Sequence, residues 1–194
     1  MSDDRAIRII AVGDIMPSGI LAGVKSGYVS PELLALLSSG DIRIGTLETA
    51  VGDNFPFSEE KMSRKKDVIH ALDADMSKLV DMGIDVVSLA NNHFFDLGPD
   101  GAAHAIGLLD ELGIQHIGAG ANIAEASSPA VFTIKGKTIA VLAFCDWREE
   151  TVGWCPIATE TAPGINPMYD DYVASEITKY KSQYDYVVVV PHWG

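Results

Sequence analysis

The sequence is poor in basic residues. Its 194 residues include 14 Lys and Arg against 27 Asp and Glu, which gives a formal net charge of −13. A field of that sign repels nucleic acid and anionic lipid surfaces, so neither is expected as a partner. An anionic substrate would therefore need a local source of positive charge, and a bound metal ion can supply it.

Cysteine and long apolar runs are also scarce. Cys145 and Cys155 are the two cysteines, and they form neither a C-x-x-C pair nor a disulfide framework, so we expect buried or unreactive thiols. No apolar run approaches the roughly 18 residues that cross a bilayer. The start, MSDDRAIRIIAVGD, has no basic segment that leads into a long apolar one. These absences predict no membrane span, no secretion signal and a cytoplasmic location.

What is present predicts one α/β domain over residues 1–194. The hydrophobic content of 47% is enough for one sizeable core. Apolar runs of strand length alternate with helix-like segments, which indicates a largely parallel sheet. The expected strands are Ile7–Val12, Ile42–Leu47, Ile84–Ala90, a short one within Gly113–Gly120, an antiparallel hairpin of Val131–Ile134 and Thr138–Phe144, and Tyr186–Val190. The expected helices are Pro31–Leu37, Asp75–Met82, Pro99–Leu112 and Tyr169–Tyr184.

Two segments are predicted as loops. Phe55–Lys66 is polar and irregular, which is typical of a surface loop or flap, and it contains a Lys/Arg cluster. Trp147–Pro167 is rich in Gly and Pro, which indicates a long loop. After the last strand the sequence ends in PHWG, whereas a buried strand normally continues into a covering element. We therefore expect the chain to be the N-terminal portion of a domain that is incomplete at the C-terminus.

Polar side chains follow four of the predicted strands. They are Asp14, Glu48, the run Asn91-Asn92-His93, and His192. Open α/β sheets place their sites at the carboxyl ends of the strands, where these side chains would gather. Divalent metals bind Asp and Glu oxygens, Asn carbonyls and His nitrogens. The repeated pattern therefore predicts a metal site at one edge of the sheet.

Each of these residues also has a structural interpretation, which the residues alone leave open. Asp14 suits a turn after glycine, Glu48 a solvated helix start, and the two asparagines left-handed turns. His93 and His192 suit loop histidines with satisfied hydrogen bonds. The histidines away from the strand ends, His70, His104 and His116, are expected to be structural or on the surface.

Several motifs together resemble the CapA family, which is linked to bacterial poly-gamma-glutamate capsule synthesis. They are GD near the start, LE after the second strand, SLANNHFFDLG (Ser88–Gly98), GAG (Gly118–Gly120) and the terminal HWG. The resemblance spans nearly the whole chain, and the NNH-x-x-D-x-G block in register with HWG is its most specific part. It implies a fold similar to the calcineurin-like metallophosphatases, a two-layer β-sandwich flanked by helices with a two-metal site at strand ends.

The resemblance also implies a role for each matching residue. The implied metal ligands are Asp14, Glu48 in the place of a metal-bridging aspartate, Asn92 and His192. His93 matches the histidine beside the substrate, where it would donate a proton or hydrogen bond, and Asp96 would orient its imidazole. The expected cofactors are one or two divalent ions, Mn, Fe or Zn.

Two departures from the family pattern bear on that site. Metallophosphatases have D-x-H in the first motif, whereas this chain has Asp14-Ile15-Met16, so one metal position loses a ligand. Glu48 also has a longer arm than aspartate, which alters the bridging geometry or favours a single tight ion. A further pair of histidines is expected beyond Gly194.

The resemblance implies a protein of poly-gamma-glutamate synthesis or processing that works by metal-dependent hydrolysis or transfer. Its partners would be polyglutamate or another anionic substrate, with a capsule synthase as a further partner. One alternative is a non-catalytic accessory protein that binds polymer or synthase, and another is a generic metallophosphoesterase. Whether the chain is an enzyme stays open at this point.

Overall fold

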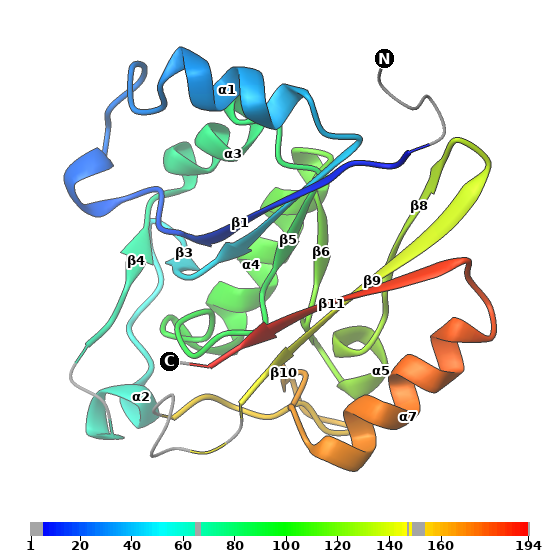
Figure 1. Ribbon diagram of the computed structural model, residues 1–194. Helices are drawn as coiled ribbons and strands as arrows, with labels where there is room; N and C mark the ends of the chain where they lie inside the picture. The colour runs from blue at the N-terminus through cyan, green and yellow to red at the C-terminus, as the bar shows by residue number, and fades with distance from the viewer. Residues whose placement is uncertain (1–5, 65–66, 147, 149–153, 194) are drawn as a thin grey trace.

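The computed structural model describes residues 6–64, 67–146, 148 and 154–193. Two β-sheets pack against each other around a shared apolar core, and helices cover their outer faces (Figure 1). This is the mixed α/β sandwich that the sequence predicts. The core forms between the sheets because the apolar runs supply strands that are buried on both faces.

The first sheet is parallel, with the strand order β1-β2-β5-β6. Its strands are β1 (Ile9–Ile15), β2 (Ile42–Leu47), β5 (Val86–Ser88) and β6 (Gln115–Ile117). β2 has the predicted bounds, whereas β1 begins and ends later than the predicted Ile7–Val12. Asp14 therefore lies among the last residues of β1 that pair with β2, after a register shift between Ala11 and Asp14.

The second sheet is mixed, with the order β11-β9-β8. It contains β8 (Ala130–Ile134), β9 (Lys137–Cys145) and β11 (Tyr186–His192). β8 and β9 form the predicted antiparallel hairpin, and β9 and β11 are parallel. The hairpin turns at Lys135 and Gly136, which both have positive φ, as two-residue hairpin turns require. β11 continues past the predicted end at Val190, so His192 is its last residue.

β9 separates the shared core from a smaller outer core. Its side chains alternate between the two faces of the sheet, as strand geometry requires. Ile139 and Val141 pack in the core between the sheets, while Leu142 and Phe144 pack against α7 (Asp170–Lys181). Full burial of each such side chain stabilises the fold by about 1.5–3 kcal/mol. The strand is therefore held from both sides.

Helices cover the outer face of the first sheet in Figure 1. They are α1 (Pro31–Ser38), η2 (Asp73–Met76) with α3 (Ser77–Asp81), and α4 (Gly98–Glu111). α1 begins where predicted, because Ser30 accepts a hydrogen bond from the Leu33 N–H and Pro31 occupies the first turn. In the described part of the chain, no helix combines the length and the apolar character needed to span a membrane.

Shorter elements connect the sheets and helices. They are η1 (Gly19–Leu21), β3 (Ala50–Val51), α2 (Glu59–Arg64), β4 (His70–Ala71), β7 (Ala119–Gly120), α5 (Ile123–Ala126) and β10 (Gly164–Ile165). β10 lies inside the predicted loop Trp147–Pro167, of which Trp147 and residues 149–153 fall outside the described residues.

The prediction that Phe55–Lys66 is a surface loop is wrong in part. This stretch contains α2, and Lys61 on that helix is buried. The pattern of residues does not reveal this helix, because the stretch is polar and shows no apolar periodicity. Lys65 and Lys66 of the predicted basic cluster fall outside the described residues.

Candidate metal centre

The carboxyl ends of both sheets meet on one side of the molecule. In Figure 1, β1 and β11 run toward the same side, and β11 ends beside the loop that follows β5. Asp14 lies on β1, Glu48 directly follows β2, Asn92 lies in the loop after β5, and His192 ends β11. The four predicted metal ligands therefore approach one place from two different sheets.

Three of these side chains form a compact donor group. Asp14, Glu48 and His192 each offer one ligand atom, and these atoms lie within 4.8 Å of one another. His192 Nδ1 is 3.7 Å from Asp14 Oδ1, and His192 Nε2 is 3.7 Å from Glu48 Oε1. Two donors bound at about 2.1 Å to one ion lie at most about 4.2 Å apart. The His192–Asp14 pair and the His192–Glu48 pair are therefore each close enough to share an ion. Two carboxylates and an imidazole also suit Mn, Fe or Zn chemically.

Asn92 joins the group through its side-chain oxygen. Asn92 Oδ1 is 3.2 Å from His192 Nε2, within hydrogen-bond distance. Glu48 and Asn92 therefore face one nitrogen of the imidazole, and Asp14 faces the other. Because the two ring nitrogens point in different directions, one ion can bind only one of them.

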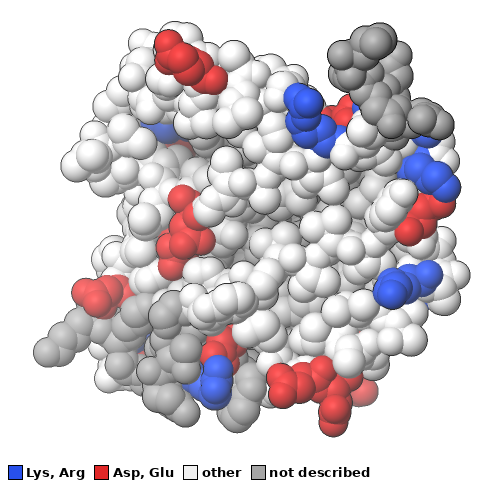
Figure 2. Space-filling view, viewed as in Figure 1, with Lys and Arg blue, Asp and Glu red and all other residues white. Residues whose placement is uncertain are grey.

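The donor group is open to solvent on one side. The Asp14 side chain is 46% exposed, whereas those of Glu48 and His192 are 16% and 8% exposed. Figure 2 shows an acidic group on this face, left of the centre, over the region where β1 ends in Figure 1. A ligand would therefore reach the group from the Asp14 side.

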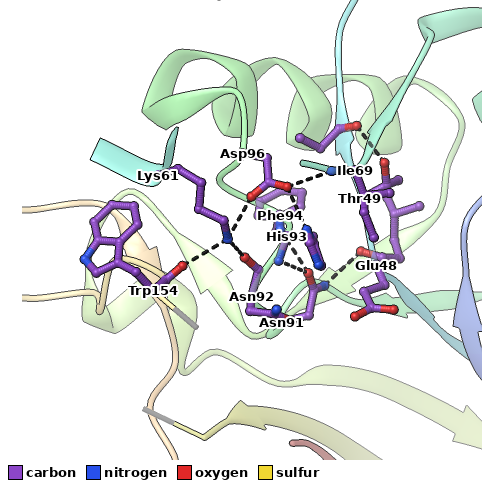
Figure 3. A network of polar contacts seen from close by, with 12 residues as sticks. Glu48, Thr49, Lys61, Ile69, Asn91, Asn92, His93, Phe94, Asp96 and Trp154 are labelled. Atoms are coloured by element: carbon purple, nitrogen blue, oxygen red, sulfur yellow. Dashed lines mark hydrogen bonds and ion pairs between the residues drawn. The ribbon is translucent and has the colours of Figure 1, made fainter. Parts of the chain in front are cut away.

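His93 and Asp96 form a buried pair beside the donor group. His93 Nδ1 lies 2.7 Å from Asp96 Oδ2, and both side chains are buried (Figure 3). The Asp96 N–H also donates to the His93 carbonyl at 3.0 Å, which closes a tight turn. The structure thus brings together the two residues that the sequence pairs as catalytic candidates. Their catalytic role stays a prediction.

Asn91 shapes the loop that carries these residues. Its side-chain oxygen accepts from the N–H groups of His93 and Phe94, and its side-chain nitrogen donates to the Leu47 carbonyl at 2.9 Å. The loop after β5 is thereby fixed to the end of β2, next to Glu48 (Figure 3). Asn91 belongs to the polar run predicted after the third strand, but the sequence assigns it no role as a metal ligand. An Asn that bonds the backbone two and three residues on is a recognised turn former.

Lys61 reaches the same network from α2. Its ammonium is 2.8 Å from Asp96 Oδ1 and donates to the backbone carbonyls of Asn92 and Trp154 (Figure 3). The sequence pattern predicts this residue in a surface flap. A lysine in a polar run carries no signal of burial, so only the tertiary contact reveals its place.

The thiols are poor metal ligands in this setting. Cys145 and Cys155 are buried and form no disulfide, as expected. A hydrogen bond with Cys155, and then burial, raise the pKa of the Cys145 thiol well above its usual range. Metals bind the thiolate, so this shift disfavours the form of the thiol that binds a metal.

The remaining histidines make local contacts. His70 Nε2 is 2.6 Å from the Gly52 carbonyl, His104 contacts Asp73, and His116 contacts Asp110. Within the described residues, the group of candidate metal ligands includes none of the three. These contacts agree with the structural role expected for them.

The fold and the strand-end donor group define the class: a metallophosphatase-like α/β protein with a candidate divalent-metal centre. A solved structure supports the fold. The chain is similar to a Staphylococcus aureus protein named as a putative 5′-nucleotidase, solved in complex with alpha-ketoglutarate, with a TM-score of 0.52 and 13% sequence identity. The match covers 96% of this chain and 37% of that one.

Residues 8–194 match the family described as bacterial capsule synthesis protein PGA_cap, and the chain belongs to that family. Among curated relatives, it is 29% identical over 203 residues to the capsule biosynthesis protein CapA of Bacillus anthracis, which covers 99% of this chain and 47% of that protein. It is 27% identical over 173 residues to a Mycobacterium tuberculosis protein named as a probable polyglutamine synthesis accessory protein, covering 84% and 44%. The chain thus spans less than half the length of each.

Proposed function

We propose that this chain provides a divalent-metal centre for hydrolysis or group transfer in the synthesis or processing of a poly-gamma-glutamate capsule. The convergence of Asp14, Glu48, Asn92 and His192 beside the His93–Asp96 pair carries the proposal. Family membership supports the link to capsule synthesis, and relatives bear the names CapA and polyglutamine synthesis accessory protein. Polyglutamate or a related anionic molecule would be the substrate, and a capsule synthase a further partner.

The geometry suggests which residues would hold each ion. Nε2 of His192, with Glu48 and Asn92 on the same side of the ring, would hold the tighter ion. A second ion would be held by Asp14, with Glu48 as the nearby carboxylate that could be shared. A bound ion supplies a water of lowered pKa and neutralises negative charge in the transition state.

The His93–Asp96 pair would serve the leaving group. Asp96 engages Nδ1, so the proton that His93 offers to a leaving group would come from Nε2. Burial of both side chains fixes the orientation of the imidazole before any substrate arrives. Fixed orientation of this kind is what a general acid needs, because misplacement of the donor atom slows proton transfer.

A non-catalytic accessory protein is the second candidate, and Met16 favours it. Met16 stands where the metallophosphatase pattern has a histidine, and it lines an apolar cavity of about 350 Å³ next to Asp14. A thioether is a soft ligand and a poor substitute for imidazole at an Mn, Fe or Zn site. The Asp14 position would then bind its ion weakly. An accessory protein that only binds polymer or synthase could tolerate such weak metal binding.

Metal content tests the proposal directly. The full-length gene product would be analysed by inductively coupled plasma mass spectrometry, with Asp14→Ala and Asn92→Ala as site variants. Asp110→Ala and Asn122→Ala serve as matched controls, because they remove the same side chains from positions outside the centre. We expect stoichiometric Mn, Fe or Zn in the wild type and in both controls, and its loss in both site variants.

Substrate turnover then separates the two candidates. Release of glutamate from polyglutamate, dependent on metal and abolished in His93→Ala, would support the hydrolase. Turnover of a chromogenic phosphoester instead would identify a generic metallophosphoesterase. A protein that contains no metal after reconstitution and turns over neither substrate would be assigned to the accessory class.

A further inference from the structure

Lys61 is an unusual anchor for a helix. Of the α2 side chains whose exposure the structure describes, residues 59–63, Lys61 alone is buried, with 1% of its surface exposed. A helix of six residues is marginal without tertiary contacts. Such a helix normally packs through an apolar side chain, whereas here the buried side chain is the lysine.

Three oxygen atoms surround the Lys61 ammonium, two as hydrogen-bond acceptors and one as its ion-pair partner. They are Asp96 Oδ1, the Asn92 carbonyl and the Trp154 carbonyl. Asn92 is a candidate metal ligand, and the Asp96 carboxylate contacts His93. The ammonium therefore contacts both the residue that would hold an ion and the carboxylate behind the proposed general acid.

Asp96 is enclosed by the segment that carries Lys61. The Ser58 N–H donates to the Asp96 carbonyl at 2.9 Å, and the Ile69 N–H donates to Asp96 Oδ2 at 2.9 Å. Lys61 neutralises the other carboxylate oxygen through an ion pair, and that oxygen has no hydrogen-bond partner among the described residues. The described residues between Ser58 and Ile69 thus wrap the loop after β5, and Lys61 supplies a buried positive charge to that contact.

We propose that Lys61 is a positioning residue: it fastens α2 over the centre and fixes Asn92 and Asp96 in the geometry that metal binding and proton donation need. This rests on the proposed function for its metal-binding part. Removal of the ammonium leaves a buried carboxylate without its counter-charge and the Asn92 carbonyl without its donor. The loop would relax, and α2 would lose its anchor.

The test uses Lys61→Met in the full-length gene product, because methionine keeps the apolar stem and removes the charge. Lys78→Met is the matched control: Lys78 on α3 is also buried and also pairs with a buried carboxylate, that of Asp75. Two readouts are needed. The first is Mn²⁺ affinity of the metal-free proteins by titration calorimetry, and the second is the rate of cleavage by Glu-C protease after Glu59 and Glu60.

We expect Lys61→Met to weaken Mn²⁺ binding by about 10–100-fold, the usual effect of losing a residue that orients a ligand. Cleavage at Glu59 and Glu60 should accelerate about tenfold or more, because an unfastened helix opens more often. Lys78→Met should weaken Mn²⁺ binding and accelerate this cleavage less than Lys61→Met does, because Lys78 pairs with Asp75 and not with Asp96. An unchanged affinity and cleavage rate in folded Lys61→Met would overturn the proposal.

Failure of the metal centre itself gives a different result. If the wild type binds no Mn²⁺, the proposed function falls, and the Glu-C rates alone decide whether Lys61 fastens α2. If Lys61→Met does not fold, the double variant Lys61→Met/Asp96→Asn removes both buried charges and is compared with Asp96→Asn. Faster cleavage in the double variant supports the anchor, and equal rates refute it.

Discussion

Asn91 holds the loop after β5 in place through hydrogen bonds in the interior. It is fully buried, and its amide satisfies two N–H groups and one carbonyl that would otherwise lose a partner there. Each buried polar group left without a partner costs about 1–3 kcal/mol. A change at Asn91 should therefore lower stability even though its side chain is outside the proposed set of metal ligands.

We predict that Asn91→Ala lowers the free energy of unfolding by about 3 kcal/mol, measured by urea denaturation. Asn122→Ala is the control, because Asn122 caps α5 at a half-buried position and its loss should cost about 1 kcal/mol. Equal losses in the two variants would mean that the Asn91 contacts contribute no more than an ordinary cap.

Candidate ligand residues are easier to predict from sequence than the residues that support them. Asp14, Glu48 and His192 can be singled out because a strand end is visible as the boundary of an apolar run. Asn91 and Lys61 cannot, because their importance depends on which backbone groups lie near them after folding. Met16 stands out only through the resemblance to a family pattern.

At the scale of elements, Asp185 fixes the start of β11 to the start of β9. Its carboxylate accepts from Lys137 Nζ at 2.7 Å and from the Thr138 N–H at 2.9 Å. The contact with Lys137, followed by the Thr138 N–H, lowers the pKa of Asp185 to about 2. This carboxylate thus links the starts of β9 and β11, and His192 lies at the other end of β11.

The lowered pKa predicts a defined pH dependence. The unfolded carboxyl titrates near pH 3.9, so the stabilising contribution of Asp185 is complete above about pH 4 and disappears as pH falls through about 2. The difference in thermal stability between wild type and Asp185→Asn, followed by circular dichroism, should shrink over that window. Lys137→Met should reduce the pH-dependent part. A difference that stays constant from pH 7 to pH 2 would contradict the assignment.

The long elements are predictable from sequence and the short ones are not. β2, the β8–β9 hairpin and α4 carry enough apolar residues to define their bounds, and the predicted bounds differ from the observed ones by at most one residue. α2 and the two-residue strands β3, β4, β7 and β10 contain too few residues to show a period. Tertiary contacts decide their structure, as the Lys61 contact shows for α2.

At the scale of the whole molecule, Gly118 lies at a point of close approach between the two sheets. It has φ of +88°, and a Cβ there would lie 2.6 Å from Ala90 Cβ and 2.9 Å from Ala143 Cβ. Ala90 follows β5 of the first sheet and Ala143 belongs to β9 of the second. Gly118, the first residue of the GAG motif, is thus a contact point between the sheets, and the other two residues of the motif form β7.

We predict that Gly118→Ala lowers the free energy of unfolding by about 1–3 kcal/mol more than Gly113→Ala does. Gly113 is the matched control, since it has φ of +70° and a Cβ added there would meet no atom within 4 Å. Gly113→Ala therefore introduces the backbone strain of a positive φ without a steric overlap between the new Cβ and its neighbours. Urea denaturation of both variants measures the difference, and equal losses would show that the sheets can separate slightly at no cost.

The order of the donors along the chain has a consequence for biosynthesis. Asp14 and Glu48 belong to the first two described strands and are synthesised before His192, which ends the last described strand. Domains fold as units once their segments have emerged, so the early carboxylates would be exposed to the metal pool of the cell long before the imidazole arrives. If the centre binds an ion as proposed, the folded protein would therefore select that ion after β11 pairs with β9. The nascent chain would not select it.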